Sequence, residues 1–201
     1  MNDITQTTNW GTFALVSYIP DPLGSFLHEL RRSLPGEHNP QPHITILPPR
    51  PLKLPVDAAS QKAQNMLLRF AAFEVELSSV RSFPETNVLY LEIAKGNRVL
   101  HDLHGTLNAD VLEHKEKFEF RPHLTLGGPV ESAHLPWVRR QVESAWYSSD
   151  HPRRFTLDEV IFLWLSPDSR QCEWRGVSSH RLGARENASR RAAVAGTRNR
   201  T

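Results

Sequence analysis

The chain has 201 residues, of which 39% are hydrophobic and 23% charged, a balance typical of a soluble folded domain. No apolar run approaches the roughly 18 residues that span a bilayer, and residues 1–10 lack the basic and apolar regions of a signal peptide. We therefore expect a cytoplasmic protein that does not enter a membrane. The one cysteine, Cys172, leaves no partner for a disulfide or a cysteine-rich zinc site.

The excess of positive over negative charge lies at the C-terminus. The net charge is +2 and the sequence pI is about 8.9, but residues 181–201 contribute +5 and the first 180 residues −3. The high pI is therefore no evidence for a basic face on the folded part. Residues 184–201 lack an apolar period, which predicts a disordered Arg-rich tail, either a solvated terminus or a weak electrostatic arm for RNA.

The predicted elements alternate between strand and helix. Alternating or β-branched apolar runs bounded by proline and glycine predict strands, and apolar residues three and four apart predict helices. In chain order they are strand 12–19, helix 21–34, strand 43–47, helix 57–72, strand 73–83, strand 88–94, helix 98–112, strand 123–126, helix 135–146, strand 155–165 and strand 172–177. Each half reads strand, helix, strand, helix, strand, which predicts a duplicated unit with a pseudo-two-fold axis. We expect one domain over residues 1–183, with lobes at approximately 12–83 and 84–178.

Two of these strands carry the same motif at the same place. Residues 42–47 read PHITIL and residues 122–127 read PHLTLG, so each runs proline, histidine, aliphatic, threonine, aliphatic. One such histidine alone would more often be a satisfied structural residue. Two matches among ten histidines are expected by chance roughly a few times in ten thousand. The matched pair therefore predicts a site.

Residues i and i+2 of a strand lie on one face. His43 therefore shares a face with Thr45, and His123 with Thr125, while the two-fold axis places the pairs opposite each other between the lobes. Two imidazoles can act as general base and general acid on a phosphodiester, and two hydroxyls can donate hydrogen bonds to phosphate oxygens. This chemistry needs no metal or cofactor. Because histidine titrates near neutrality, it predicts a bell-shaped dependence of rate on pH.

The paired motifs resemble those of the 2H phosphoesterase superfamily, also called the 2′-5′ RNA ligase-like family, over most of residues 12–178. The resemblance implies an α+β fold of two lobes around a central cleft, each with an antiparallel-type sheet flanked by helices. It implies that His43 and His123 are acid and base, and that Thr45 and Thr125 bind phosphate.

Members of this family act on 2′,3′-cyclic phosphates, 2′-5′ linkages or ADP-ribose cyclic phosphates. In the bacterial RNA 2′,3′-cyclic phosphodiesterases a basic residue commonly follows the second motif, where this chain has Gly127 and Gly128. The resemblance thus names the superfamily more firmly than one branch of it.

Two arginines are close enough to the motifs in sequence to reach the rim of the cleft. Arg50 and Arg121 are candidates for contacts to phosphate, with solvation of the surface as the alternative. Base stacking needs aromatic side chains near the cleft, and four lie on or beside predicted strands: Tyr18, Phe83, Tyr90 and Trp164. Packing in the core is the more common role for each.

A histidine-rich helix is the remaining candidate site. His101 and His104 lie three residues apart, with His114 further on, but no carboxylate motif accompanies them and a solvated helix face explains them better. No GxxxxGK[ST] or GxGxxG motif supports ATP-dependent ligation or a dinucleotide cofactor.

The leading hypothesis is a metal-independent, monomeric phosphoesterase. It would cleave, or reversibly form, 2′,3′-cyclic or 2′-5′ phosphodiester bonds in RNA ends or small cyclic nucleotides. The alternative is a binding module that holds nucleotide or RNA in the same cleft without turnover. A third hypothesis is an interaction protein that works through its Arg-rich tail.

Overall fold

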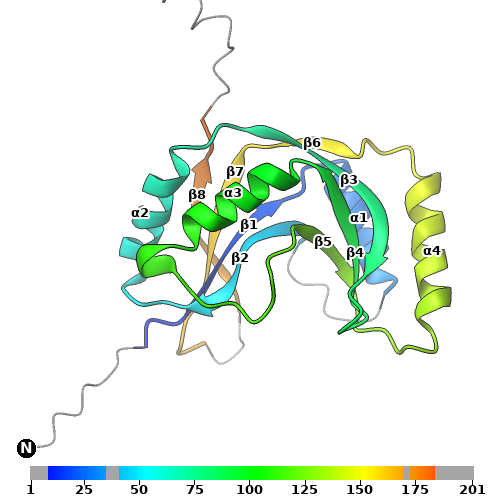
Figure 1. The fold of residues 1–201 in the computed structure, drawn as a ribbon, viewed down its shortest axis with the longest axis horizontal. Helices are drawn as coiled ribbons and strands as arrows, with labels where there is room; N and C mark the ends of the chain where they lie inside the picture. Colours follow the sequence, from blue (N-terminus) through cyan, green and yellow to red (C-terminus); the bar gives the residue numbers. More distant parts are fainter. Residues whose placement is uncertain (1–8, 35–40, 170–172, 184–201) are drawn as a thin grey trace, which may run out of the picture.

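Eight strands form one antiparallel sheet in the computed structural model, which describes residues 9–34, 41–169 and 173–183 (Figure 1). The strands are β1 (Thr12–Tyr18), β2 (His43–Pro51), β3 (Phe73–Ser82), β4 (Leu89–Lys95), β5 (His123–Gly127), β6 (Arg154–Leu157), β7 (Glu159–Leu165) and β8 (Arg175–Arg181). The helices are α1 (Leu23–Arg32), α2 (Val56–Leu67), α3 (Asn97–Leu107) and α4 (Leu135–Ser148), with a short 3-10 helix η1 (Asp110–Leu112). The predicted tail at 184–201 and Cys172 lie outside the described residues.

The two motif strands are neighbours at the centre of the sheet, whose order is β6-β3-β4-β5-β2-β1-β7-β8. Among the described residues, β2 and β5 pair only at Ile44 and Leu124. We call β2, β1, β7 and β8 the first half-sheet, and β5, β4, β3 and β6 the second half-sheet. The sheet is curled (Figure 1), and a parallel bridge between Ala71 and Gly183 links the chain before β3 to the chain after β8.

The sequence predicts two sheets, one in each of two lobes that are contiguous in the chain. The structure has a single sheet, and its halves do not follow those lobes. β3, predicted in the first lobe, pairs with β4 because residues 83–88 form a tight hairpin turn, with Phe83 N–H donating to Val88 O at 3.0 Å. The predicted strand 155–165 is broken at Asp158 into β6, which pairs with β3, and β7, which pairs with β1. The described residues therefore form one sheet, whose second half-sheet is the middle of the chain and whose first half-sheet joins its two ends.

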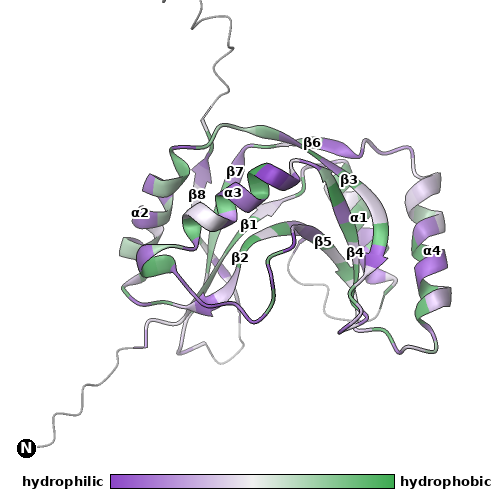
Figure 2. Ribbon diagram, in the orientation of Figure 1, coloured by the Kyte–Doolittle hydropathy of each residue, from purple (hydrophilic) through white to green (hydrophobic). Residues whose placement is uncertain are grey.

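Helices cover one face of the sheet, and two of them cover the half opposite to their own strand. α1 follows β1 but packs on β5, and α3 follows β4 but packs on β2 (Figure 1). α2 packs on β8 and α4 on β3, and in Figure 2 the outlying α4 is coloured mostly hydrophilic while hydrophobic colour recurs along the strands. None of the described helices is long and apolar enough to cross a bilayer.

β2 continues to Pro51, although its three prolines predict an end at Leu47. Leu15 pairs with Leu47 and Phe13 with Arg50, so a two-residue step on β1 faces a three-residue step on β2. The extra residue forms a bulge, where proline is tolerated because the ladder of hydrogen bonds is interrupted. Past the bulge, Arg50 lies opposite Phe13, a core residue, and therefore points to the side covered by helices.

Candidate functional site

The predicted alternation of faces is present on both motif strands. The residues that face the helices are fully buried: Ile44, Ile46, Leu124 and Leu126. The residues of the opposite face keep solvent contact, with three half-buried and one exposed: His43, Thr45, His123 and Thr125. Both motifs therefore present their polar side chains on the face of the sheet that the helices leave uncovered.

The pairing of Ile44 with Leu124 sets the relation between the motifs. An antiparallel pair has a local two-fold axis perpendicular to the sheet, which here exchanges Ile44 with Leu124. The same axis exchanges His43 with His123, and the threonine of one motif with that of the other. The structure therefore brings the four side chains together across adjacent strands at the seam between the half-sheets. Their proximity is also electrostatic, because a charge on His123 lowers the pKa of His43.

Both histidines are oriented by the carbonyl two residues earlier. The Nδ1 atom of His43 lies 2.7 Å from Gln41 O, and that of His123 lies 2.7 Å from Arg121 O. A carbonyl only accepts, so in each ring Nδ1 carries the hydrogen and donates it. In the neutral ring, Nε2 is then the free acceptor. Each histidine can take up or release a proton at Nε2 while Nδ1 holds its orientation.

Burial lowers the pKa of both rings. For His43 the largest cause of the lower pKa is desolvation, opposed by the bond to Gln41 and assisted by the charges of Arg31 and His123. For His123 desolvation again lowers the pKa most, opposed by its carbonyl bond and assisted by the charge of Arg121. The lowered pKa values favour neutral rings at pH 7. A bound phosphate, being an anion, would favour the protonated form of a ring beside it.

Aromatic side chains surround His123 more closely than His43. The rings of Phe83 and Tyr90 stack at 4.2 Å between centroids, and each meets His123 edge-on, at 4.9 and 5.4 Å. On the other side, Tyr18 meets His43 edge-on at 6.3 Å. Tyr90 pairs with Thr125 across β4 and β5, so it belongs to the same face. Three of the four aromatic candidates thus lie beside a motif histidine.

The fourth aromatic candidate packs in the core. Trp164 packs against the buried cluster and donates its Nε1 hydrogen to Trp10 O at 2.8 Å. Its partner across β7 and β1 is Phe13, on the side of the sheet covered by helices. Of the two roles weighed for Trp164, the structure supports packing.

The two arginine candidates lie in different surroundings, one exposed and one buried. Arg121 lies beside His123, with Nη1 3.5 Å from the Tyr90 hydroxyl and its guanidinium carbon 5.9 Å from the centre of the Phe83 ring. It is exposed, and its place at the rim of a cleft stays a prediction. The prediction for Arg50 is wrong, because only 1% of its side chain is exposed and its guanidinium contacts Glu116 and three other protein groups.

Sequence reasoning missed two charged groups of this region. Arg31, in the last turn of α1, is 5% exposed and its charge lowers the pKa of His43. Nothing in the sequence indicates that the end of α1 reaches the start of β2, because α1 packs on the opposite half-sheet. Glu92 pairs with His123 across β4 and β5 and lies 3.5 Å from Arg81. The alternation of residues in the predicted strand 88–94 could have placed Glu92 on this face.

The histidine-rich helix holds no cluster for a metal. In the described part of the chain, no group of three or more His, Cys, Asp or Glu residues could bind an ion. His104 is engaged by Ile46 O, 2.8 Å from its Nδ1, and by Glu116, 3.5 Å from its Nε2. His101 meets the ring of Phe120 edge-on.

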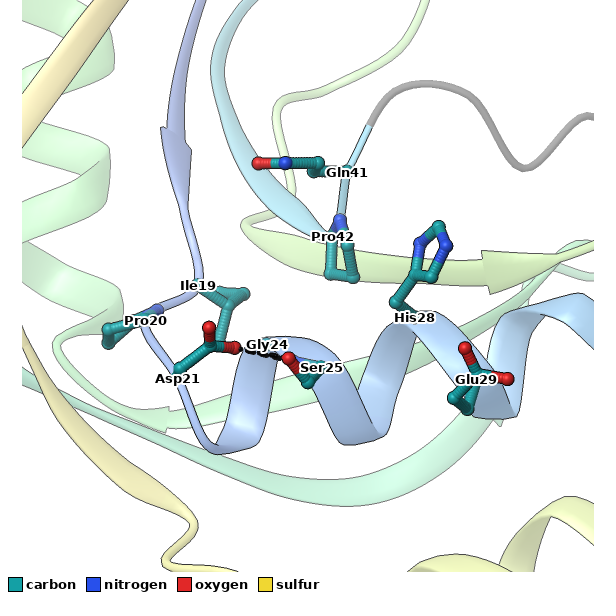
Figure 3. Close-up of a pocket in the computed structure, with 9 residues that line it drawn as sticks. All are labelled: Ile19, Pro20, Asp21, Gly24, Ser25, His28, Glu29, Gln41 and Pro42. Atoms are coloured by element: carbon teal, nitrogen blue, oxygen red, sulfur yellow. Dashed lines mark hydrogen bonds between the residues drawn. The ribbon is translucent and has the colours of Figure 1, made fainter.

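A pocket of about 460 Å³ lies next to the two residues that precede the first motif strand (Figure 3). It is bounded by the end of β1, one side of α1 and the two residues before β2, among them Gln41, whose carbonyl orients His43. Asp21 accepts hydrogen bonds from the backbone and hydroxyl of Ser25 within it, at 2.9 and 2.6 Å. The pocket therefore adjoins the His43 support rather than the seam between the motifs.

Comparison with known proteins identifies relatives of the chain. Residues 19–168 match the family model of the 2′-5′ RNA ligase superfamily. A protein of Geobacillus sp. (strain WCH70), provisionally named a phosphoesterase, is 31% identical over 109 residues, which cover 50% of this chain and 62% of that protein. The chain thus spans less than two thirds of this relative. A second such protein, from Geobacillus kaustophilus, is 27% identical over 140 residues, 65% of this chain and 77% of the relative.

Solved structures share the fold. Escherichia coli LigT in its apo form has a TM-score of 0.60 and 13% identity, covering 88% of this chain and 99% of LigT. A protein of Thermus thermophilus has a TM-score of 0.59 and 15% identity, covering 87% of this chain and all of that one. These likenesses support an α+β fold with a curled antiparallel sheet. Because the family model covers most of its length, the chain belongs to the 2′-5′ RNA ligase superfamily of 2H phosphoesterases.

Proposed function

We propose that the chain is a metal-independent phosphoesterase that cleaves phosphodiester bonds by acid-base catalysis with His43 and His123. The observation that carries this proposal is the matched support of the two rings, each with Nδ1–H bonded to a carbonyl and with no hydrogen-bond partner for Nε2 in the described part of the chain. The two rings lie on one face and are related by a local two-fold axis. One ring, when neutral, can accept a proton, and the other ring, when protonated, can donate one. Thr45 and Thr125 lie on the same face of the sheet.

In hydrolysis of a 2′,3′-cyclic phosphate, one neutral imidazole takes a proton from water as the water oxygen bonds to phosphorus. The bond from phosphorus to one ribose oxygen breaks, and the second ring, protonated, gives its proton to that oxygen. The first ring ends protonated and the second neutral, so solvent exchange restores the starting state. The two threonine hydroxyls donate hydrogen bonds to the phosphate oxygens, on which negative charge accumulates.

Nucleotides are the substrate class that we propose, as RNA ends with a 2′,3′-cyclic phosphate or 2′-5′ linkage, or as small cyclic nucleotides. Structures of Escherichia coli LigT include complexes with 3′-AMP and with ATP. In this chain, the half-buried Phe83 ring lies beside His123, stacked on the buried Tyr90 ring and with Arg121 next to it. That combination suits a base and a phosphate. Both motifs come from one sheet, so the proposed site needs no second copy.

The test is turnover in the presence of EDTA. Purified protein is assayed on nucleoside 2′,3′-cyclic phosphates, 2′-5′ linked oligomers and ADP-ribose cyclic phosphate, with identification of each product. His43→Ala and His123→Ala should lose turnover, whereas His134→Ala, an exposed histidine paired with Glu131, should keep it. Full activity in either motif variant would contradict the mechanism. Nucleotide binding with no product over hours would support the binding module instead.

A further inference from the structure

The connection between η1 and β5 carries the group that orients His123. Residues 113–122 form neither helix nor strand, and Arg121 in this segment offers the carbonyl that accepts the Nδ1 hydrogen of His123. Among the described residues, no backbone-to-backbone hydrogen bond outside the strands involves 114–122. Apart from the β4–β5 ladder, which begins at His123, the described contacts that hold this segment are therefore made by side chains.

The first anchor is a buried ion pair. Glu116 of the connection accepts a hydrogen bond from Arg50 of β2, and the two side chains are only 15% and 1% exposed. Arg50 also donates to Pro48 O at 3.0 Å, to the side-chain oxygen of Asn108 at 2.6 Å and to Leu112 O at 3.4 Å. One guanidinium thus joins β2, the end of α3 and the connection.

The second anchor is His104 of α3. Its Nδ1 lies 2.8 Å from Ile46 O, one residue after Thr45, so the ring is fixed against β2. Phe120 stacks on this ring at 3.8 Å between centroids with the planes 6° apart. Phe120 immediately precedes Arg121. His104 Nε2 also lies 3.5 Å from Glu116, so both anchors share one carboxylate.

The described support of the first motif comes from the backbone. Gln41 orients His43, and the next residue, Pro42, is held by the backbone, with Ile19 N–H donating to its carbonyl at 3.0 Å. Arg50 lies seven residues after His43. The residue seven positions after His123 is Val130, which is apolar. A buried ion pair is seldom a gain in stability over an apolar pair. An ion pair that joins β2 to the connection therefore calls for a role other than packing.

We infer that Glu116 is a positioning residue for His123, acting with Arg50 and His104 through the connection and the Arg121 carbonyl. The path is continuous in space, from β2 to the two anchors, then to Phe120, the Arg121 carbonyl and the His123 ring. The inference deepens the proposed function by naming what holds one of its two catalytic rings. It rests on that function only for the effect on turnover.

The test compares two acid-to-amide variants of the same region. Glu116→Gln removes the charge of the shared carboxylate. Asp110→Asn, the matched control, removes the charge of an exposed ion pair with Lys62 at a position whose φ of 56° asparagine tolerates. Nitrogen NMR of the imidazoles reports the His123 tautomer without any substrate. We expect the Nδ1–H form in wild type and in Asp110→Asn, and a mixture of tautomers in Glu116→Gln.

Turnover gives the second readout. We expect kcat of Glu116→Gln to fall about 10- to 100-fold with KM within about twofold, as for a misplaced reacting group. Arg50→Met with Glu116→Gln removes the remaining unpaired charge, so it would recover kcat if lost stability alone were responsible. Positioning predicts that kcat stays low.

Two results would overturn the inference. One is a Glu116→Gln variant with the wild-type His123 tautomer, and the other is recovery of kcat in the double variant. If wild type turns over none of the substrates, the proposed function fails, while the tautomer measurement still decides on the positioning role.

Discussion

His43 and His123 each donate Nδ1–H to the carbonyl two residues earlier, yet the two supports differ in kind. The first rests on a backbone hydrogen bond to the end of β1, and the second on an ion pair and a stacked histidine brought from β2 and α3. The surroundings differ as well, since Phe83 and Tyr90 flank His123 and Tyr18 flanks His43. Repetition of a strand motif therefore reproduces the ring geometry locally, while long-range contacts distinguish the two rings.

The largest expected effect tests whether both histidine rings transfer protons. If both transfer protons, His43→Ala and His123→Ala each lower kcat by about 10²- to 10⁴-fold, the usual contribution of a general acid or base. The measurement is single-turnover hydrolysis of a nucleoside 2′,3′-cyclic phosphate in EDTA. A much smaller loss in one variant would mean that one ring orients substrate without transferring a proton.

The threonines give the next effect. Thr45→Val and Thr125→Val keep the side-chain shape and remove one donor to the phosphate, which should lower kcat by about 10²-fold in each case. Thr45 is half-buried and Thr125 exposed, so unequal losses would show which hydroxyl faces the reacting oxygen. Wild-type kcat in both variants would exclude the phosphate-binding role.

A smaller effect separates the rings by pH. The charge of Arg121 lowers the pKa of His123, so Arg121→Gln should raise that pKa and move the His123 limb of the kcat/KM profile to higher pH. The His43 limb should move less, because the charge of Arg121 is not among the causes of its lowered pKa and reaches it only through the charge of His123. A shift of both limbs together would show that the pair titrates as a unit.

The smallest effect concerns stability, in a contrast between helix packing on the two half-sheets. Under α2, buried His180 of β8 bonds Ser178 at 2.9 Å, and burial lowers the pKa of His180. Under α4 the corresponding contact is Trp146 donating to Ser78 O at 2.7 Å, which does not titrate.

A histidine whose pKa is lower in the folded than in the unfolded protein stabilises the fold above the unfolded pKa. That contribution is lost as pH falls through the folded pKa. Denaturant unfolding at pH 7 and pH 5 should therefore show a smaller loss of unfolding free energy in His180→Gln than in wild type. An equal loss in both proteins would assign the pH dependence to other groups.

The sequence predicts what is local. Strand alternation places His43 with Thr45 and His123 with Thr125 on one face, because the period of two acts within a single strand. The pairing of strands is not local in this sense. The alternation of residues in β3 would suit any neighbouring strand, and the short turn between β3 and β4 decides that these two pair. The same distinction explains Arg50. Its distance along the chain from Thr45 suggests a rim residue, but a bulge turns it to the core beside Glu116.

The crossing of α1 and α3 has a consequence for folding. Each helix is tied by sequence to one half-sheet and by packing to the other, while β2 and β5 share only one pair among the described residues. To separate the half-sheets, both helices would have to lose their apolar contacts at the same time. The two half-sheets should therefore unfold in one cooperative transition. The distance between His43 and His123 should stay constant until that transition.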